Sequence, residues 1–489
     1  MKKIYIFLLT IVTVSFSSCN DWLELQPENN QVSDEYWANK EEVEAVLGAG
    51  YVRLRECMEQ MLVWGEMRGN GLTMGFGTID VNIYRINQWD IGPGNEFVKW
   101  DKFYQVINYA NMVIKYGPTV VDKDPSFSEN VMQSYLSEAY FLRGLAYFYL
   151  VRNFRDVPLI TAPYMDDSQS FEVEKSPANE VYQQIKSDLE GALEFSKEIA
   201  PTVWETKGRS TKWAIQAALA DVYLWTEEYD KCIAACDAVI NSGQLGLLQG
   251  MMNNNNNWYT IFNPGNSNEG IFELQFEFDK NQTNSLVSWF GTNNRYVISE
   301  NTAQLFQEEE EDIRGKGASY TEEDSRVWKY LGAEAGTGIP RTYSDQNWII
   351  YRIADIYLMK AEALVMNGPN SYDEAVEILN VIRDRAQISA PVSSASTELE
   401  MLQMVMDERA REFVGEGKNW YDLLRVGSRN NYQYKDYLIT QVLLTAPASS
   451  APIIRSKLLD ENSHYLPIHI NELSANRLLV QNPYYDNLN

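Results

Sequence analysis

The strongest constraint on the fold is a helical spacing of apolar residues that recurs along most of the chain. Apolar residues three and four positions apart lie on one face of an α-helix. The spacing predicts helices over 41–57, 98–116, 131–154, 177–198, 211–226, 229–241, 351–367, 372–386 and 399–416. The segment 144–151 is apolar nearly all round, which is typical of a helix buried between other helices. We therefore expect a mainly α-helical fold.

Two pairs of these helices have the spacing of a tetratricopeptide repeat, which is a helix, a tight turn and a second helix. The pairs are LADVYLWTEEYDKCIAACDAVI at 219–240 and IADIYLMKAEALVMNGPNSYDEAVEILNVIRDRA at 353–386, and a looser pair joins 134–152 to 177–195. Such pairs cannot bury their apolar faces alone, so they must stack on one another. Cys232 and Cys236 fall at core positions of the first pair. We interpret them as small buried residues and not as a redox pair.

The segment 243–345 has a different character from the helical segments. It contains five consecutive asparagines at 253–257, many glycines and an alternating stretch, IFELQFEF, at 271–278. This composition predicts loops with a few short strands laid over the helices. We expect an N-terminal region over 19–240 and a C-terminal region over 241–489 that together form one compact unit.

The N-terminus predicts export and a lipid anchor. Lys2 and Lys3 precede an apolar run at 4–14, and small residues at Ser17 and Ser18 precede Cys19. This pattern is typical of a secretory signal peptide over 1–18, and its apolar run is shorter than the ~20 residues of a membrane span. Small residues before a cysteine also resemble a bacterial lipoprotein box, which makes Cys19 the expected lipidated N-terminus. The alternative is a plain signal peptide followed by a structural cysteine.

The charge and the scarce histidines exclude several classes of function. A net charge of −27 repels phosphate, so nucleic acid and anionic lipid are poor partners. His464 and His469 are the only histidines, which leaves little for a metal site or a catalytic triad. We interpret both as structural, and we expect no metal and no cofactor.

One helix carries acids that could be mistaken for catalytic groups. Glu408, Glu412 and Glu416 lie four residues apart with Arg409 and Arg411 among them. A glycosidase needs two carboxyl groups on either side of a sugar, and neighbours on one helix give poor geometry for that. An internal network of ion pairs is the better interpretation, so we expect no catalytic residue here.

Aromatic residues in polar, glycine-rich stretches are the candidates for a ligand site. The two stretches are 75–97 and 285–301, where aromatics stand beside amides and basic groups. Flat aromatic faces with hydrogen-bonding neighbours suit a sugar ring, and they suit a peptide equally. The alternative is that these rings fasten the loops to the helices. The predicted ligand-binding residues are Tyr84, Trp89, Trp289, Asn293, Arg295 and Tyr296.

Four long segments resemble, in order, the motifs of the SusD/RagB family of nutrient-uptake lipoproteins. They are SEAYFLRGLAYFYLVRNFRDVPLI, WIIYRIADIYLMKAEAL, DERAREFVGEGKNWYDLLRVG and YLPIHINELSANRLLVQNPYY. His469 stands where the family usually has a second proline, and Lys418-Asn419 stands where a Gln-Arg pair is common. These segments match the scaffold of the family, so they carry no ligand-binding residue over to this chain.

The resemblance implies a SusD-like fold of tetratricopeptide-like helices with a loop-rich region. It also implies an outer-membrane lipoprotein that faces the cell exterior, and the acidic Asp21 and Glu24 after Cys19 resemble a surface-export signal. Such proteins are lids over a SusC-like TonB-dependent transporter, to which they deliver glycans or peptides, and they are not enzymes as a class. From the residues alone, a surface glycoside hydrolase and a scaffold that binds only other proteins remain alternatives.

Overall fold

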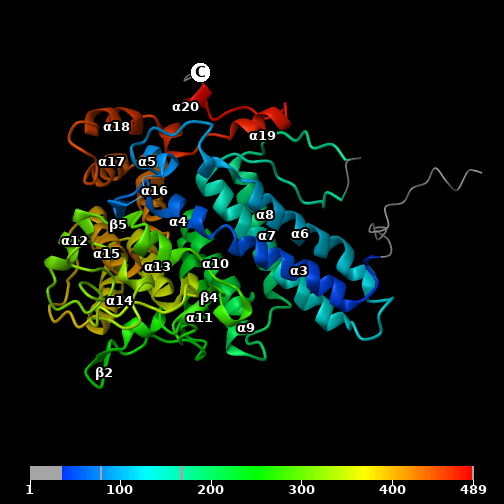
Figure 1. Ribbon diagram of the computed structural model, residues 1–489, viewed down its shortest axis with the longest axis horizontal. Coiled ribbons are helices and arrows are strands. Elements are labelled where there is room, and N and C mark those ends of the chain that lie inside the picture. The colour runs from blue at the N-terminus through cyan, green and yellow to red at the C-terminus, as the bar shows by residue number, and fades with distance from the viewer. Residues whose placement is uncertain (1–35, 78–79, 166–168, 487–489) are drawn as a thin grey trace, which may run out of the picture.

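The computed structural model describes residues 36–77, 80–165 and 169–486, and most of these residues are helical (Figure 1). All nine predicted helices are present within a few residues of their expected ends. They are α3 (Lys40–Arg55), α6 (Asp101–Tyr116), α7 (Glu129–Phe154), α8 (Ala178–Leu193), α10 (Lys212–Trp225), α11 (Tyr229–Ile240), α13 (Ile353–Met366), α14 (Tyr372–Arg385) and α15 (Glu398–Phe413). The prediction of a mainly helical fold is confirmed.

The helices pack in chain order, each against the next. The predicted pairs α10–α11, α13–α14 and α7–α8 are in contact, and α11 also packs on α13, which joins one pair to another. Cys232 and Cys236 are buried on the inner face of α11 and form no disulfide, as their spacing predicts. The stack buries faces that no single pair could bury alone.

The loop-rich segment contributes short strands. The strand β4 (Gly270–Leu274) pairs antiparallel with β6 (Trp348–Arg352), and every residue of both strands is buried. The expected strand at 271–278 ends early, because Glu277 and Gln282 exchange backbone hydrogen bonds of 2.9 and 3.0 Å and close a tight turn. Within that turn Phe278–Lys280 form the 3-10 helix η4. A second short pair joins β2 (Met251–Met252) to β3 (Asn255–Asn256).

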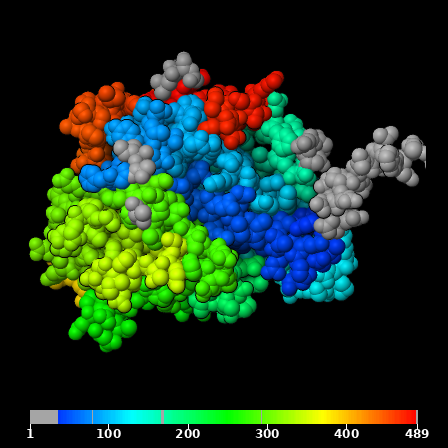
Figure 2. Space-filling model, viewed as in Figure 1, coloured from blue at the N-terminus to red at the C-terminus, as the bar shows by residue number. Residues whose placement is uncertain are grey.

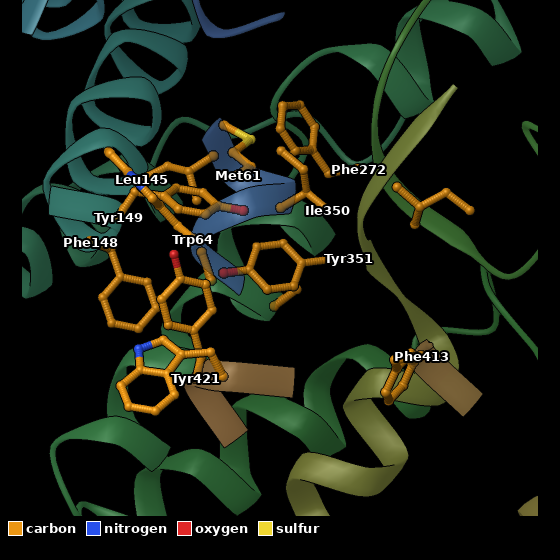
Figure 3. Close-up of a cluster of buried hydrophobic side chains, with 14 of the residues drawn as sticks. Met61, Trp64, Leu145, Phe148, Tyr149, Phe272, Ile350, Tyr351, Phe413 and Tyr421 are labelled. Carbon is orange, nitrogen blue, oxygen red and sulfur yellow. The ribbon is translucent and has the colours of Figure 1, made fainter. Parts of the chain in front are cut away.

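An aromatic core joins segments that are far apart in the sequence. Figure 3 shows side chains from α4 (Met58–Glu66), α7, β6 and α16 (Asn419–Tyr432) gathered in one cluster. Trp64 stacks on Phe103 at 4.9 Å, and the edge of Tyr149 meets Tyr421 at 6.2 Å. Large buried rings of this kind contribute much of the stability of a core.

Both histidines form hydrogen bonds within the C-terminal segment. His464 is buried, its Nε2 lies 2.9 Å from the Leu458 carbonyl oxygen, and burial lowers its pKa to about 4. His469 accepts a hydrogen bond from the Asn471 amide and caps α19 (Ile470–Ala475). Their structural role is confirmed. The remaining helices of this segment are α17 (Lys435–Leu443), α18 (Ala451–Leu458) and α20 (Pro483–Asp486).

Candidate functional site

The two stretches predicted to bind ligand lie side by side. The strand β1 (Leu72–Met74) pairs antiparallel with β5 (Tyr296–Ile298), and the amides of Gly75 and Gly77 extend the pairing to the Arg295 and Asn294 carbonyls. A Cβ atom on Gly77 would lie 1.6 Å from the Asn293 carbonyl oxygen, so this close approach requires glycine. The glycines of the first stretch therefore serve to bring the second stretch against it.

A short helix, α5 (Val81–Asn87), follows β1 and was not expected from the sequence. Asp80 begins it, and its carboxylate accepts a hydrogen bond of 2.9 Å from the Asn82 amide. Ile83 and Ile86 point into the core. The sequence predicts no helix in this stretch, and the structure corrects that: one cap and two buried isoleucines are enough to hold two turns in place.

The outward side of this region carries exposed apolar and aromatic side chains. Tyr84 is 48% exposed, and Phe76 is 94% exposed. Sequence reasoning missed Phe76, although its position between two glycines in GFG left it without neighbours to pack against. We call the group formed by Phe76, Val81, Tyr84 and Arg85 the α5 surface. Figure 2 shows this segment in mid-blue near the upper left of the visible face.

Three of the predicted aromatic residues have no face open to solvent. Trp89 is buried and meets Trp420 edge-on at 5.3 Å, while Trp289 meets Tyr296 edge-on at 6.5 Å and both rings are buried. The expectation of exposed stacking faces is wrong for these three rings, because each packs against another ring of the core. They fasten the loops to the helices, which is the alternative that the sequence left open.

The two predicted polar residues are half-buried and engaged inside the protein. The Asn293 side-chain amide donates to the Ser288 hydroxyl at 2.6 Å. Arg295 donates to the Glu59 carboxylate at 3.2 Å. Of the six residues predicted from the sequence, Tyr84 alone is an exposed aromatic residue, and the structure adds the exposed Phe76.

The acids of α15 form the ion-pair network that their spacing predicted. Glu408 and Glu412 lie 2.6 and 2.7 Å from the Arg314 guanidinium, and Glu416 lies 2.9 Å from Arg352. All three acids are buried, and the surrounding guanidiniums hold the pKa of Glu412 well below its usual range. A glycosidase acid needs a raised pKa and access to a sugar, and these buried carboxylates have neither.

Two further observations concern metals and membranes. Nowhere in the described ranges do three or more His, Cys, Asp or Glu side chains form a group that could hold a metal ion. Among the same residues, no helix has both the length and the apolar character needed to cross a membrane. Cys19 lies outside the described residues.

Two family models match this chain, one in each half. The model of the SusD family matches residues 248–485, and a model described as starch-binding and associating with the outer membrane matches residues 21–224. The chain belongs to the SusD/RagB family.

Two relatives share this similarity along most of their length, and a third shares it over a short segment. A SusD-like protein of Formosa agariphila is 26% identical over 95% of this chain and 99% of its own, and one of Bacteroides ovatus is 27% identical over 85% and 82%. The starch-binding protein SusD of Bacteroides thetaiotaomicron is 36% identical over 93 residues, which are 19% of this chain and 15% of that protein.

Solved structures share the fold. A SusD superfamily protein of Bacteroides vulgatus superposes with a TM-score of 0.74 at 20% identity, covering 92% of this chain and all of that one. A laminarin-binding SusD-like protein superposes with a TM-score of 0.68 at 23% identity, covering 91% and 99%. The predicted SusD-like fold is confirmed.

Proposed function

We propose that this protein is a non-catalytic, lipid-anchored binding protein of the outer membrane that captures a glycan and delivers it to a SusC-like TonB-dependent transporter as its lid. The observation that carries the proposal is the α5 surface. It presents Phe76 and Tyr84 to solvent beside a well-packed core. Loops and short helices held by a rigid scaffold are where binding residues tend to lie.

The chemistry of the α5 surface favours sugar. An aromatic face stacks on the apolar face of a sugar ring, and the exposed Arg85 beside Tyr84 adds hydrogen-bond donors. The family description names starch, and two similar proteins are named for binding starch and laminarin. A peptide is the alternative ligand for the same surface.

We propose that the protein is not catalytic because the acids of α15 are buried and paired with arginines. Glu408, Glu412 and Glu416 are buried and held by arginines, which leaves them no access to a glycosidic bond. Glycoside hydrolysis needs two accessible carboxyl groups across a sugar. Release of reducing sugar from any polysaccharide by the purified protein would contradict this part of the proposal.

The anchor and the partner rest on the sequence and the family. Lipidation of Cys19 would hold the protein at the outer membrane, facing the cell exterior. Replacing Cys19 by Ala is expected to abolish palmitate labelling and to release the protein from the outer-membrane fraction.

A lid needs an extensive contact with its barrel, and lasting complexes often bury more than about 2,000 Å². Affinity purification from the native membrane under gentle detergent should recover a large TonB-dependent protein, and recovery of the lipoprotein alone would contradict the lid role.

The ligand class is tested by affinity electrophoresis in gels that contain starch, laminarin, xylan or pectin, beside calorimetry with a peptide pool. We expect retardation by at least one polysaccharide, and weaker retardation of Phe76→Ala and Tyr84→Ala. Phe195→Ala is the matched control, because Phe195 is also an exposed aromatic residue but lies just after α8, outside the α5 surface. Heat release with peptides and no retardation by any polysaccharide would overturn the glycan assignment.

A further inference from the structure

A second group of exposed aromatic rings lies around the turn at η4. Trp204, on α9 (Val203–Gly208), is 39% exposed, and Phe278 and Tyr343 are exposed as well. Phe278 stacks on Tyr343 with ring centres 4.0 Å apart and planes 20° from parallel, and Lys280 lies 5.1 Å from the Trp204 ring centre. Large exposed rings that gather on one part of a surface mark a site of interaction.

A cleft opens beside these rings. Its volume is about 400 Å³, and it is bounded by α3, α9 and the chain that follows β4. Trp204 forms part of the wall, Val52 and Leu274 add apolar surface, and Gln275 and Gln282 add amide groups. A concave, largely apolar wall with a few polar groups is the usual form of a small-ligand site.

The cations in and beside the cleft have partners within the protein, and Glu205 adds a carboxylate that accepts a hydrogen bond from the Thr202 hydroxyl. Arg209 pairs with Glu44 at 3.2 Å and with Glu138 at 2.9 Å. Arg55 donates to the Gln275 carbonyl oxygen at 3.1 Å. Lys280, at the rim, pairs with Glu277 at 2.7 Å. Because these cations are engaged and the whole chain is acidic, with a net charge of −27, the cleft favours a neutral ligand over an anionic one.

The cleft is separate from the α5 surface. Figure 1 places α9 near the lower edge of the molecule and α5 near its upper left, with the body of the helix stack and the loop-rich segment between them. The two groups of rings also belong to different segments of the chain, 76–85 for one and 204, 278 and 343 for the other. A polymer could therefore contact both, whereas a short oligosaccharide could occupy only one.

We propose that the cleft bounded by α3, α9 and the chain that follows β4 is a second binding site for a neutral glycan chain, with Trp204 as its stacking platform. This inference rests on the proposed glycan-binding function and extends it to a second place on the protein. Two sites on one protein raise the apparent affinity for a polymer well above that of either site, because the second contact is made within the first complex. The expected consequence is stronger binding to polysaccharide than to a short oligosaccharide of the same sugar.

The test compares the parent with Trp204→Ala, Trp204→Phe and Tyr84→Ala in gels that contain starch, laminarin, xylan or pectin. Trp204→Ala is expected to bind about tenfold more weakly to the neutral polysaccharide that retards the parent. A tenfold loss is the size expected when one stacking anchor is removed. Trp204→Phe is expected to restore most of the binding. Val381→Ala is the control, because Val381 is exposed on α14, outside the cleft. Thermal unfolding of all variants is expected to match the parent, since Trp204 is partly exposed.

Each other result has a distinct meaning. If the parent binds a neutral polysaccharide and Trp204→Ala binds it equally well, the second site is overturned and the proposed function stands. Stronger retention by pectin, which is anionic, than by the neutral polysaccharides overturns the neutral ligand class. A parent that binds none of the polysaccharides overturns the proposed glycan-binding function and this inference with it.

Discussion

The helix stack and the exposed surfaces use side chains in opposite ways. Within the stack, Glu412 lies between Arg314, Arg352 and Arg385, and all four side chains are buried. On the surfaces, Phe76 and Trp204 turn apolar rings toward solvent. Burial with satisfied partners makes one region rigid and specific in its packing, and exposure leaves the other free to contact a ligand.

This contrast follows the family motifs. The segments that resemble the SusD/RagB pattern include Arg352, Glu412 and Glu416, which hold the network together. Phe76, Tyr84 and Trp204 lie outside those segments. A scaffold fixed by its internal ion pairs can therefore carry different surface residues, and function is determined by the site placed on the fold. Substitutions in each region test whether the two are as independent as this contrast implies.

The largest effect is expected from Glu412→Gln. The carboxylate receives hydrogen bonds from three guanidiniums at 2.5 to 2.7 Å, and an amide would leave those buried cations without the compensating charge. Removing one member of a buried ion pair costs about 3–5 kcal/mol. We expect a loss of that size in the free energy of unfolding, measured with urea at neutral pH.

The matched control for Glu412→Gln is Glu310→Gln. Glu310 is exposed in the acidic run that follows α12 (Glu300–Gln307), so the same chemical change should alter the free energy of unfolding by less than about 0.5 kcal/mol. Equal losses for the two variants would mean that the network contributes nothing beyond general charge.

The next largest effect is expected from Trp89→Ala. The Trp89 ring is buried against Trp420, and the backbone carbonyl oxygen of Trp89 accepts a hydrogen bond of 2.6 Å from Lys457. These two contacts fasten the end of α5 to the C-terminal helices. Removing a buried tryptophan ring costs about 3 kcal/mol. Chemical unfolding should show this loss. The same measurement on Tyr84→Ala should show almost none, and a similar loss for both variants would contradict the separation between the fastening ring and the exposed ring.

The helix stack was predictable from the sequence because its signal is local. Repeated apolar spacing fixes each helix, and the tetratricopeptide-like spacing fixes which helices pair. The helix α5 was missed because its seven residues hold too few periods, and its stability comes from the Asp80 cap and the burial of Ile83 and Ile86. Sequence reasoning thus found the scaffold and missed an element that only tertiary contacts define.

The candidate sites were predictable only in part. The stretches 75–97 and 285–301 were identified, and they do lie together. The burial of Trp89 depends on Trp420, which is distant in the sequence, so loop composition alone could not reveal it. The cleft at η4 combines α3, α9 and the chain after β4, three segments with no common pattern.

A moderate effect that depends on pH is expected from Glu66→Gln. Burial raises the pKa of Glu66 to about 8, although the amides of Gly417 and Lys418 donate to one of its oxygens at 2.8 and 3.3 Å. In the unfolded chain Glu66 loses its proton near its ordinary pKa of 4.5, whereas in the folded state it keeps the proton up to about pH 8. The stability that this proton contributes is therefore lost as the pH rises from about 4.5 through about 8. Gln is neutral at every pH and keeps an acceptor. Relative to the parent, we expect Glu66→Gln to gain about 2 kcal/mol between pH 6 and pH 8.

Urea unfolding of both proteins at the two pH values measures that gain. The paired acids give the opposite dependence, because their arginine and lysine partners lower the pKa of Asp355 and Glu362 to about 2. Their stabilisation is present above their ordinary values and is lost as pH falls toward 2, in the parent and the variant alike. An equal difference between parent and variant at pH 6 and pH 8 would show that Glu66 is ionised without cost.

The smallest effect on stability is expected from Phe76→Ser. Phe76 is almost fully exposed, so replacing it removes few contacts from the folded state. The free energy of unfolding should therefore change by less than about 0.5 kcal/mol.

The matched variant is Phe97→Ser. Phe97 is buried in the 3-10 helix η1 (Glu96–Val98), so this change should cost several kcal/mol, about the 3–5 kcal/mol of other large buried rings. Calorimetric unfolding of the two variants and the parent separates the cases, and polysaccharide affinity is measured on the same samples. Unchanged unfolding with weaker binding for Phe76→Ser would assign this ring to the ligand, whereas a loss above about 1 kcal/mol would show that it packs on the protein and belongs with Trp89.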